Sequence, residues 1–161
     1  MKRFFPQPAK LAALSAHRRR LLLRAVPTLF IVKVKLRLIS FGNLYRAVER
    51  RCQSPEHAWQ ASPRPRPSAD EIAWAVLAAH HAVPGGNNCL ARALAAKLML
   101  ARFGYRSELR VGALKNEADA FAAHAWLEAE GRIIVGGAEA GDFTVFGGLD
   151  KAAGAGQHAG E

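Results

Sequence analysis

The spacing of hydrophobic positions changes along the chain near residue 105. Before this point, leucine, alanine and valine recur at three- and four-residue intervals, as in amphipathic helices. After it, residues 107–116 and 122–130 alternate apolar and polar positions with a period of two, as in half-buried strands. We therefore predict an α+β fold in which helices come first and an antiparallel sheet follows.

Residues 9–51 mix leucine and arginine at helical spacing, and Pro27 is expected to divide them into two helices. The stretch "VKVKLRLI" within them alternates like a strand, but its helical flanks favour a helix. Ser68 and Glu71 form the pattern of a capping box, which predicts a helix that ends near His81.

The turn "AVPGGNN" precedes another predicted helix, which runs from about Asn88 to Phe103 and stops at Gly104. Its expected buried stripe consists of Leu90, Leu94, Leu98 and Met99. A third strand is predicted over residues 131–137, after a tight turn at Glu130 and Gly131, and "FTVFGGL" is expected to add a short strand.

The chain of 161 residues suits one compact domain with accessory sequence. Composition divides it into a basic helical N-terminal region, a Pro-rich linker, a core and a tail without an apolar pattern, which is expected to be disordered. The predicted boundaries are 1–60, 61–69, 70–148 and 149–161.

The net charge of +10 is unevenly distributed. Residues 1–68 hold 15 Lys/Arg and 2 Asp/Glu, whereas residues 69–161 hold 8 and 11. Four interpretations stay open for the basic region: packing on the core, docking to a partner protein or peptide, contact with a membrane surface, and nucleic-acid binding. Nucleic acid is the weakest, because no set of stacking aromatic residues accompanies the arginines.

The number of cysteines and the length of the apolar runs indicate the cellular compartment of the protein. Cys52 and Cys89 do not make a disulfide framework, and no signal peptide is evident. The longest uncharged apolar run in the first fifty residues, Ala25 to Val32, is far shorter than the roughly 20 residues that span a bilayer. We expect a cytoplasmic protein, with the basic region as a candidate for peripheral contact with the inner face of the membrane.

Cys89 and His124 are the candidate catalytic pair. Cys89 begins a predicted helix, whose N-terminus favours a thiolate and offers backbone N–H groups to an oxyanion. His124 lies on a predicted strand and is the candidate base. Each residue alone is more often structural: buried cysteine is a common packing residue, and Cys52 is interpreted as an inert free thiol.

Three neighbours of Cys89 are candidates for oxyanion or substrate binding. Asn87 and Asn88 can form an oxyanion hole, or they are simply a turn and an N-cap. Arg92 lies on the same helix face as Cys89 and can hold a substrate carboxylate or Glu128, or form an ordinary ion pair. We expect no metal and no cofactor, because spaced cysteine pairs and a phosphate-binding glycine pattern are both missing.

Residues 84–137 resemble the C-terminal domain of McjB-type lasso-peptide maturation proteins, a branch of the transglutaminase-like superfamily. The matching motifs are "CLARAL" at 89–94, "ELRVG" at 108–112 and "AHAWLE" at 123–128. The resemblance implies a papain-like core in which a cysteine at a helix N-terminus packs on a small antiparallel sheet. It also implies a cysteine peptidase that removes the leader from a ribosomal precursor peptide, through a thioester on Cys89 with His124 as base and acid.

The resemblance implies partners as well: the precursor peptide, a separate leader-binding protein and an asparagine-synthetase-like cyclase. The pattern fails at the orienting acid, which is expected about twelve residues after His124, where Gly136 and Gly137 stand. A two-residue turn would place position 137 opposite His124. Asp142 and Glu139 are the replacement candidates. Acyl or amide transfer through the same thioester, and a scaffold without chemistry, stay as alternatives.

Overall fold

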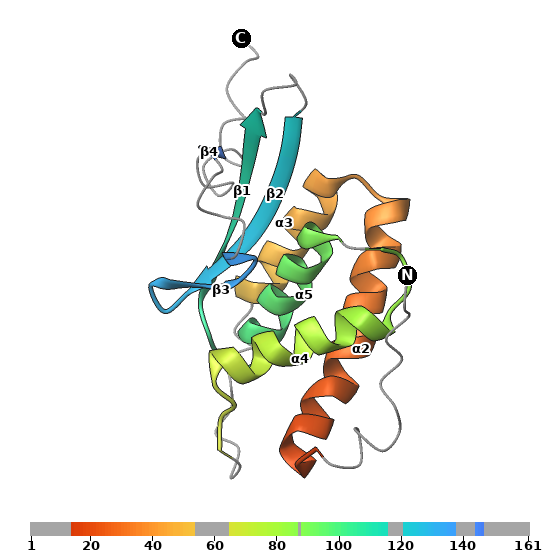
Figure 1. Cartoon of the computed structure of the whole chain (residues 1–161), viewed down its shortest axis with the longest axis vertical. Helices are drawn as coiled ribbons and strands as arrows, with labels where there is room; N and C mark the ends of the chain where they lie inside the picture. Colours follow the sequence, from red (N-terminus) through yellow and green to blue (C-terminus); the bar gives the residue numbers. More distant parts are fainter. Residues whose placement is uncertain (1–13, 54–64, 87, 116–120, 138–143, 147–161) are drawn as a thin grey trace.

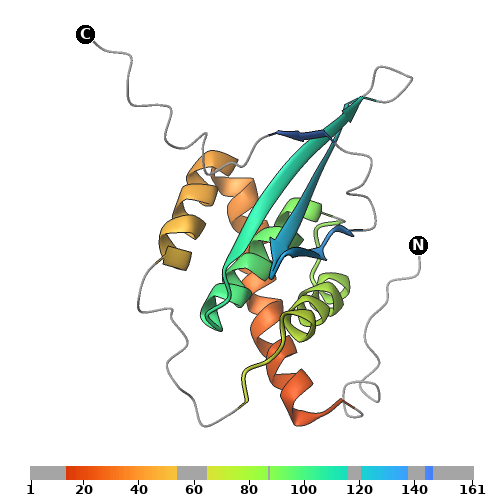
Figure 2. The same ribbon diagram turned by 90° about the vertical axis from the view of Figure 1, so that its left-hand side faces the viewer.

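The computed structural model describes residues 14–53, 65–86, 88–115, 121–137 and 144–146. Within these residues the fold is α+β, as predicted, and the helices gather on one side of an antiparallel sheet (Figures 1 and 2). The helices are α2 (Ala16–Leu38), α3 (Phe41–Gln53), α4 (Ala69–Ala82) and α5 (Cys89–Arg102). The strands are β1 (Ser107–Lys115), β2 (Phe121–Ala129), β3 (Arg132–Val135) and β4 (Thr144–Phe146).

The described strands form one sheet in the order β3-β2-β1-β4, with every neighbouring pair antiparallel. The predicted tight turn between β2 and β3 is confirmed: Glu130 and Gly131 have φ values of 54° and 75°. Two successive left-handed residues are typical of a two-residue hairpin turn, whose twist matches that of the strands. The predicted short fourth strand is also confirmed, at residues 144–146.

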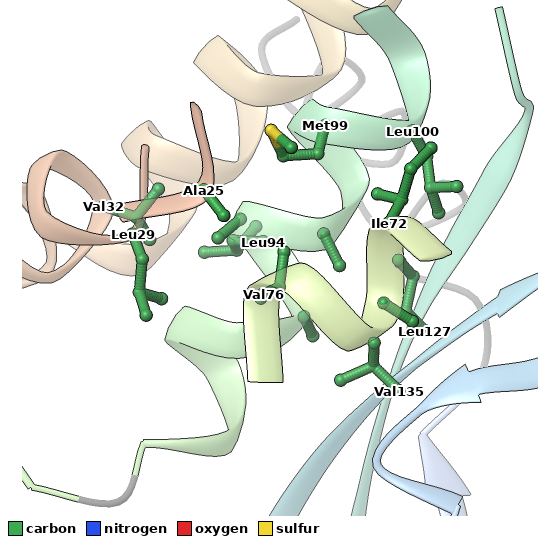
Figure 3. Close-up of a cluster of buried hydrophobic side chains, with 14 of the residues drawn as sticks. Ala25, Leu29, Val32, Ile72, Val76, Leu94, Met99, Leu100, Leu127 and Val135 are labelled. Atoms are coloured by element: carbon green, nitrogen blue, oxygen red, sulfur yellow. The ribbon is translucent and has the colours of Figure 1, made fainter. Parts of the chain in front are cut away.

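Helix α5 is the centre of the fold. It packs against α2, α3 and α4 on one side and against β1 and β2 on the other. Leu94 and Met99 are fully buried, as predicted (Figure 3). Leu90 and Leu98 are only partly buried. The prediction of one buried stripe is therefore wrong, because Leu100 and several alanines on other faces of this enclosed helix are buried too.

The ends of α4 and α5 follow the sequence signals. Ser68 Oγ accepts a hydrogen bond from the N–H of Glu71, and the Glu71 carboxylate accepts one from the N–H of Ser68, which completes the capping box. Gly104 has a φ of 73° after the last turn of α5. The N–H groups of Gly104 and Tyr105 bond back to the last carbonyls of the helix, which is the Schellman ending that glycine favours.

Helix α2 continues through Pro27, so the predicted break at this residue is wrong. Proline removes one backbone hydrogen bond and costs roughly 3 kcal/mol inside a helix. The helix persists because its inner side, with Leu21, Ala25 and Leu29, is buried against α4 and α5. The following "VKVKLRLI" stretch is helical through Leu38, as its flanks indicated.

The basic helices share the hydrophobic core with the rest of the fold. Leu29 and Val32 of α2 and Leu44 of α3 belong to the same buried cluster as the residues of α4, α5 and the sheet. Of the predicted linker at 61–69, the structure describes residues 65–69, of which Ala69 already begins α4. The predicted tail at 149–161 lies outside the described residues. None of the described helices has the length and apolar composition needed to cross a bilayer.

Candidate active site

Cys89 is the first residue of α5, and it lies partly buried at the margin of the hydrophobic core. Asn88 is the N-cap: its Oδ1 accepts a hydrogen bond from the N–H of Ala91 at 2.9 Å, and its carbonyl oxygen accepts one from the N–H of Arg92 at 3.1 Å. The remaining first-turn N–H groups give this end of the helix a partial positive charge beside the sulfur. The predicted helix start is thus confirmed. Of the two roles considered for the Asn88 side chain, oxyanion binding and N-cap, the structure shows the N-cap.

A lysine from a distant helix holds the turn that leads to Cys89. Lys33 of α2 is buried, and its Nζ donates hydrogen bonds to the carbonyl oxygens of Val83 at 3.0 Å, Pro84 at 3.4 Å and Gly86 at 3.2 Å. These carbonyls belong to the end of α4 and to the loop after it. The ammonium group therefore ties this loop to α2.

Sequence reasoning missed Lys33. Desolvation lowers its pKa, and the charges of Arg37 and Arg92 lower it further. In the sequence, Lys33 and Lys35 look alike, two positions apart in "VKVK". Only their positions around the helix distinguish the two lysines. At 100° per residue, Lys33 is directed toward α4 and Lys35 is left exposed.

His124 lies buried on β2, and its Nε2 is 3.0 Å from the carbonyl oxygen of Gly136. A carbonyl oxygen can only accept a hydrogen bond, so Nε2 must be the donor and carry the hydrogen. In the neutral ring this leaves Nδ1 as the nitrogen that accepts a proton. The backbone of Gly136 therefore selects the tautomer, a role that a carboxylate has in other catalytic triads.

The group that contacts His124 lies at the expected distance in sequence, twelve residues later. It is a backbone carbonyl, however, and not the expected acid. The register between β2 and β3 shifts by a bulge at Leu127 and Glu128, and β3 ends at Val135. The prediction that position 137 lies opposite His124 is therefore wrong. Gly136 contacts His124 instead, through its main chain.

The contact requires glycine at position 136. Gly136 has a φ of 86°, a conformation that residues with a side chain rarely adopt. A Cβ at this position would lie 3.0 Å from both the carbonyl oxygen of Ala125 and the Cβ of Trp126. The chain passes so close to β2 that only hydrogen fits, and this close approach brings the Gly136 carbonyl to the imidazole.

Alternation along β2 sets the side on which His124 lies. Ala125 and Leu127 belong to the core between the sheet and the helices, so His124 and Trp126 project to the other side of the strand. The two rings are nearly parallel, with centroids 6.2 Å apart. Cys89 begins α5, which packs against the other face of β2, so alternation along the strand does not by itself bring the two side chains together. Contact between sulfur and ring stays a prediction.

Glu128 has a structural environment rather than a catalytic one. Its carboxylate is 3.3 Å from Arg110 Nε and accepts a hydrogen bond from Trp126 Nε1 at 3.1 Å. Arg110 also pairs with Glu108 at 2.9 Å. Among the described residues, the ion pairs do not include Arg92, whose buried Nε lacks a hydrogen-bond partner there.

The other three candidates lie outside the described residues: Asn87, Glu139 and Asp142. Their proposed roles stay predictions. The second thiol is described, and burial raises the pKa of Cys52 to about 11, which agrees with its interpretation as an inert thiol.

The structure also contains a groove of about 910 Å³, lined in part by Glu128 of β2. It runs between α3 and the turn from β2 to β3, and its walls include Arg46, Arg50, Glu108 and Glu130 but neither Cys89 nor His124. The groove therefore does not hold the proposed chemistry.

Comparison with known proteins agrees with the fold. Residues 28–147 match a family of the transglutaminase-like superfamily, Transglut_core3. No curated protein and no solved structure matches the chain. Because the match covers more than half of the sequence, the chain belongs to the transglutaminase-like superfamily. Cysteine hydrolases and transferases are common in this superfamily, so cysteine-based chemistry is the class of activity to test.

Proposed function

We propose that this protein is a cysteine peptidase that removes the leader from a ribosomal precursor peptide of the lasso type. The observation that carries the peptidase is the tautomer of His124: Nε2 donates to the Gly136 carbonyl at 3.0 Å, so Nδ1 is the proton acceptor. The start of α5 supplies the nucleophile, Cys89. The substrate class rests on the "CLARAL", "ELRVG" and "AHAWLE" motifs.

The proposed reaction has two steps. His124 Nδ1 takes the thiol proton as Cys89 Sγ attacks the carbonyl carbon of the last leader residue. The C–N bond breaks, His124 returns the proton to the departing amine of the core peptide, and the leader stays on sulfur as a thioester. Water then adds, its proton passes through His124 to sulfur, and the leader leaves with a free carboxyl group.

The N-terminus of α5 supports both steps. Its N–H groups are candidates for stabilising the oxyanion that forms on the attacked carbonyl in each step. Asn88 Oδ1 accepts a hydrogen bond in the cap, and an oxyanion needs a donor, so the candidate donors on this residue are its backbone N–H and its side-chain Nδ2. Lys33 holds the preceding loop in place, which positions Cys89 indirectly through the main chain.

Among the described residues, the Gly136 carbonyl is the group that orients the imidazole at the position where the resemblance implies an acid. A carbonyl dipole stabilises an imidazolium less than a carboxylate does, so we expect a slower enzyme than a full triad provides. The partners in this proposal are a separate leader-binding protein, which presents the precursor, and an asparagine-synthetase-like cyclase, which closes the ring afterwards.

The test is cleavage of candidate precursor peptides, followed by mass spectrometry, with a leader-binding protein added. We expect one cut at the leader–core junction. Products that carry an added amine would indicate acyl transfer instead. A folded protein that makes no product with any precursor and partner would favour the scaffold.

Gly136→Ala tests the orienting contact, with Gly131→Ala as its control. Both glycines have left-handed φ values, 86° and 75°, but a Cβ at Gly131 would meet nothing within 4 Å. We expect roughly 10- to 100-fold loss of kcat for Gly136→Ala, because the imidazole loses its tautomer and orientation. Its pH–rate profile should also change shape. Gly131→Ala should keep the profile, and equal profiles for the two variants would reject the proposed role of Gly136.

A further inference from the structure

The outer side of α2 carries a row of exposed apolar side chains. Leu23 and Leu38, at its two ends, are 74% and 75% exposed. At 100° per residue the members fall within an arc of roughly 140°, so they share one face of the helix. They are Leu23, Val26, Phe30, Ile31, Val34 and Leu38, and we call them the α2 outer row.

The outer row is separate from the side of α2 that builds the core. At 100° per residue, it is centred on the side opposite Leu21, Ala25, Leu29 and Val32, which are buried. Figure 1 shows α2 at the margin of the helical layer, with α5 between it and the sheet. The α2 helix thus has two apolar sides, and only one of them is buried in the core. The exposed side is a candidate for binding another surface.

Cations surround the outer row on the exposed face of α2. Helical phase places Arg19, Arg20 and Arg37 on the same face as the row, toward its two ends, and Arg24 and Lys35 beside it, and all five are exposed. Helix α2 contains neither Asp nor Glu. An apolar row with cations at its ends and along one side, without carboxylates, complements a surface that is apolar inside and anionic outside. A lipid bilayer with acidic headgroups has this arrangement.

We propose that the outer row of α2 docks this protein on the surface of an anionic lipid bilayer. The helix lies parallel to the surface, the outer row enters the boundary between headgroups and acyl chains, and the arginines contact lipid phosphates. A protein partner for this surface would have to bring carboxylates to the cations at both ends of the row and beside it, whereas a bilayer supplies anions at every position.

Docking would bring the candidate active site close to the lipid. A pocket of about 270 Å³ is lined by Phe30 and Val34 of the outer row together with Gly85 and Asn88, next to Cys89. The turn before the nucleophile therefore borders the docking surface. The docking proposal does not depend on the peptidase reaction, and it can be tested without a substrate.

The experiment is flotation of the full-length protein with vesicles of phosphatidylcholine containing 30% phosphatidylglycerol, compared with pure phosphatidylcholine. We expect binding to the anionic vesicles that weakens as salt rises. Phe30→Ser combined with Leu38→Ser should weaken binding at least tenfold. The control is Ile133→Ser, which removes an exposed apolar side chain from β3 and should leave binding unchanged.

A charge variant keeps the proposal testable if the apolar variant does not fold. Arg19→Gln with Arg20→Gln should weaken binding about fivefold for each cation removed, whereas Arg106→Gln, an exposed cation in the groove beside α3, should not. Failure of the wild type to float with anionic vesicles would overturn the proposal. So would a dimer, measured by light scattering, that Phe30→Ser with Leu38→Ser converts to monomer, because the outer row would then bind a second copy.

Discussion

The two cysteines lie near opposite ends of the same helix. Cys89 is the first residue of α5. Cys52, on α3, lines a small pocket together with Leu98, Ala101 and Arg102 from the last turns of α5. One thiol is therefore near the positive end of the helix dipole, and the other is near the negative end.

The surroundings of Cys52 favour the neutral thiol. Burial raises its pKa to about 11, while the neighbouring charges of Lys97 and Glu49 act in opposite directions. These two residues also pair with each other at 2.7 Å. The comparison teaches that residue type alone does not identify a nucleophile, because burial keeps a thiol such as Cys52 protonated.

The largest expected effect follows from replacing each cysteine in turn. Cys89→Ala should reduce leader cleavage by roughly 10³-fold or more, because the thioester cannot form. Cys52→Ala should change the rate less than about twofold, since its side chain does not touch the reaction. The measurement is the rate of product formation by mass spectrometry with equal amounts of folded protein. Cleavage that survives Cys89→Ala would remove the nucleophile from the proposal.

Alkylation separates the two thiols without a substrate. At pH 8, Cys52 in the folded protein should react with iodoacetamide about 100-fold more slowly than in urea, because its pKa rises from 9.0 to about 11. Cys89, partly exposed at the start of α5, should be labelled first. Peptide mapping of a labelling time course measures both rates. Faster labelling of Cys52 than of Cys89 would contradict the comparison.

The raised pKa of Cys52 also predicts that the stability of the folded protein depends on pH. Folded Cys52 keeps its proton between pH 9 and about 11, whereas the unfolded chain loses it, so the folded state binds more protons there. The stabilising contribution is fully present below pH 9 and is lost as pH rises through about 11. Cys52→Ala should remove this part of the decline in urea-unfolding free energy.

Lys33→Met tests the support of the loop before Cys89, with Lys35→Met as the control on the same helix. Lys33→Met removes three hydrogen bonds from an ammonium group and should cost about 1–3 kcal/mol of unfolding free energy. Cleavage should slow about tenfold as Cys89 loses its position. Lys35 is exposed, so its variant should change stability by less than about 0.5 kcal/mol. Equal urea midpoints for the two variants would count against a role for Lys33.

The smallest effect concerns the cap beside the nucleophile. Asn88→Ala should cost about 1 kcal/mol, because the N–H of Ala91 loses its acceptor at 2.9 Å. Asn88→Ser keeps an acceptor and should keep stability, measured by thermal unfolding. Its cleavage rate should stay within a few-fold of the wild type. A 100-fold loss in a stable Asn88→Ser protein would instead assign the side-chain amide to the oxyanion.

Local signals predicted the elements of the fold well. The capping box at Ser68, the stop at Gly104 and the turn at Glu130 and Gly131 all lie where the sequence indicated. Each depends on a few neighbouring residues, and its hydrogen bonds close within one turn of chain. The position of Cys89 at a helix start is of the same kind, which is why the candidate nucleophile was identified from the sequence.

Other features were decided by contacts between distant segments. Pro27 stays helical because α4 and α5 bury the other side of α2. Lys33 reaches carbonyls about fifty positions away, and no local pattern marks it. Counting twelve residues from His124 predicted the position of Gly136. That its carbonyl contacts His124 depends on the bulge between β2 and β3 and on the close approach of the chain to β2.

The amino-acid sequence by itself thus determined the helices, the strands and the candidate thiol and imidazole, because backbone propensity and periodicity act over a few residues. The tertiary structure alone decided which group orients His124, which lysine holds the loop before Cys89 and which side of α2 is left exposed. These depend on the packing of segments far apart in the chain, where burial and close approach outweigh local preference.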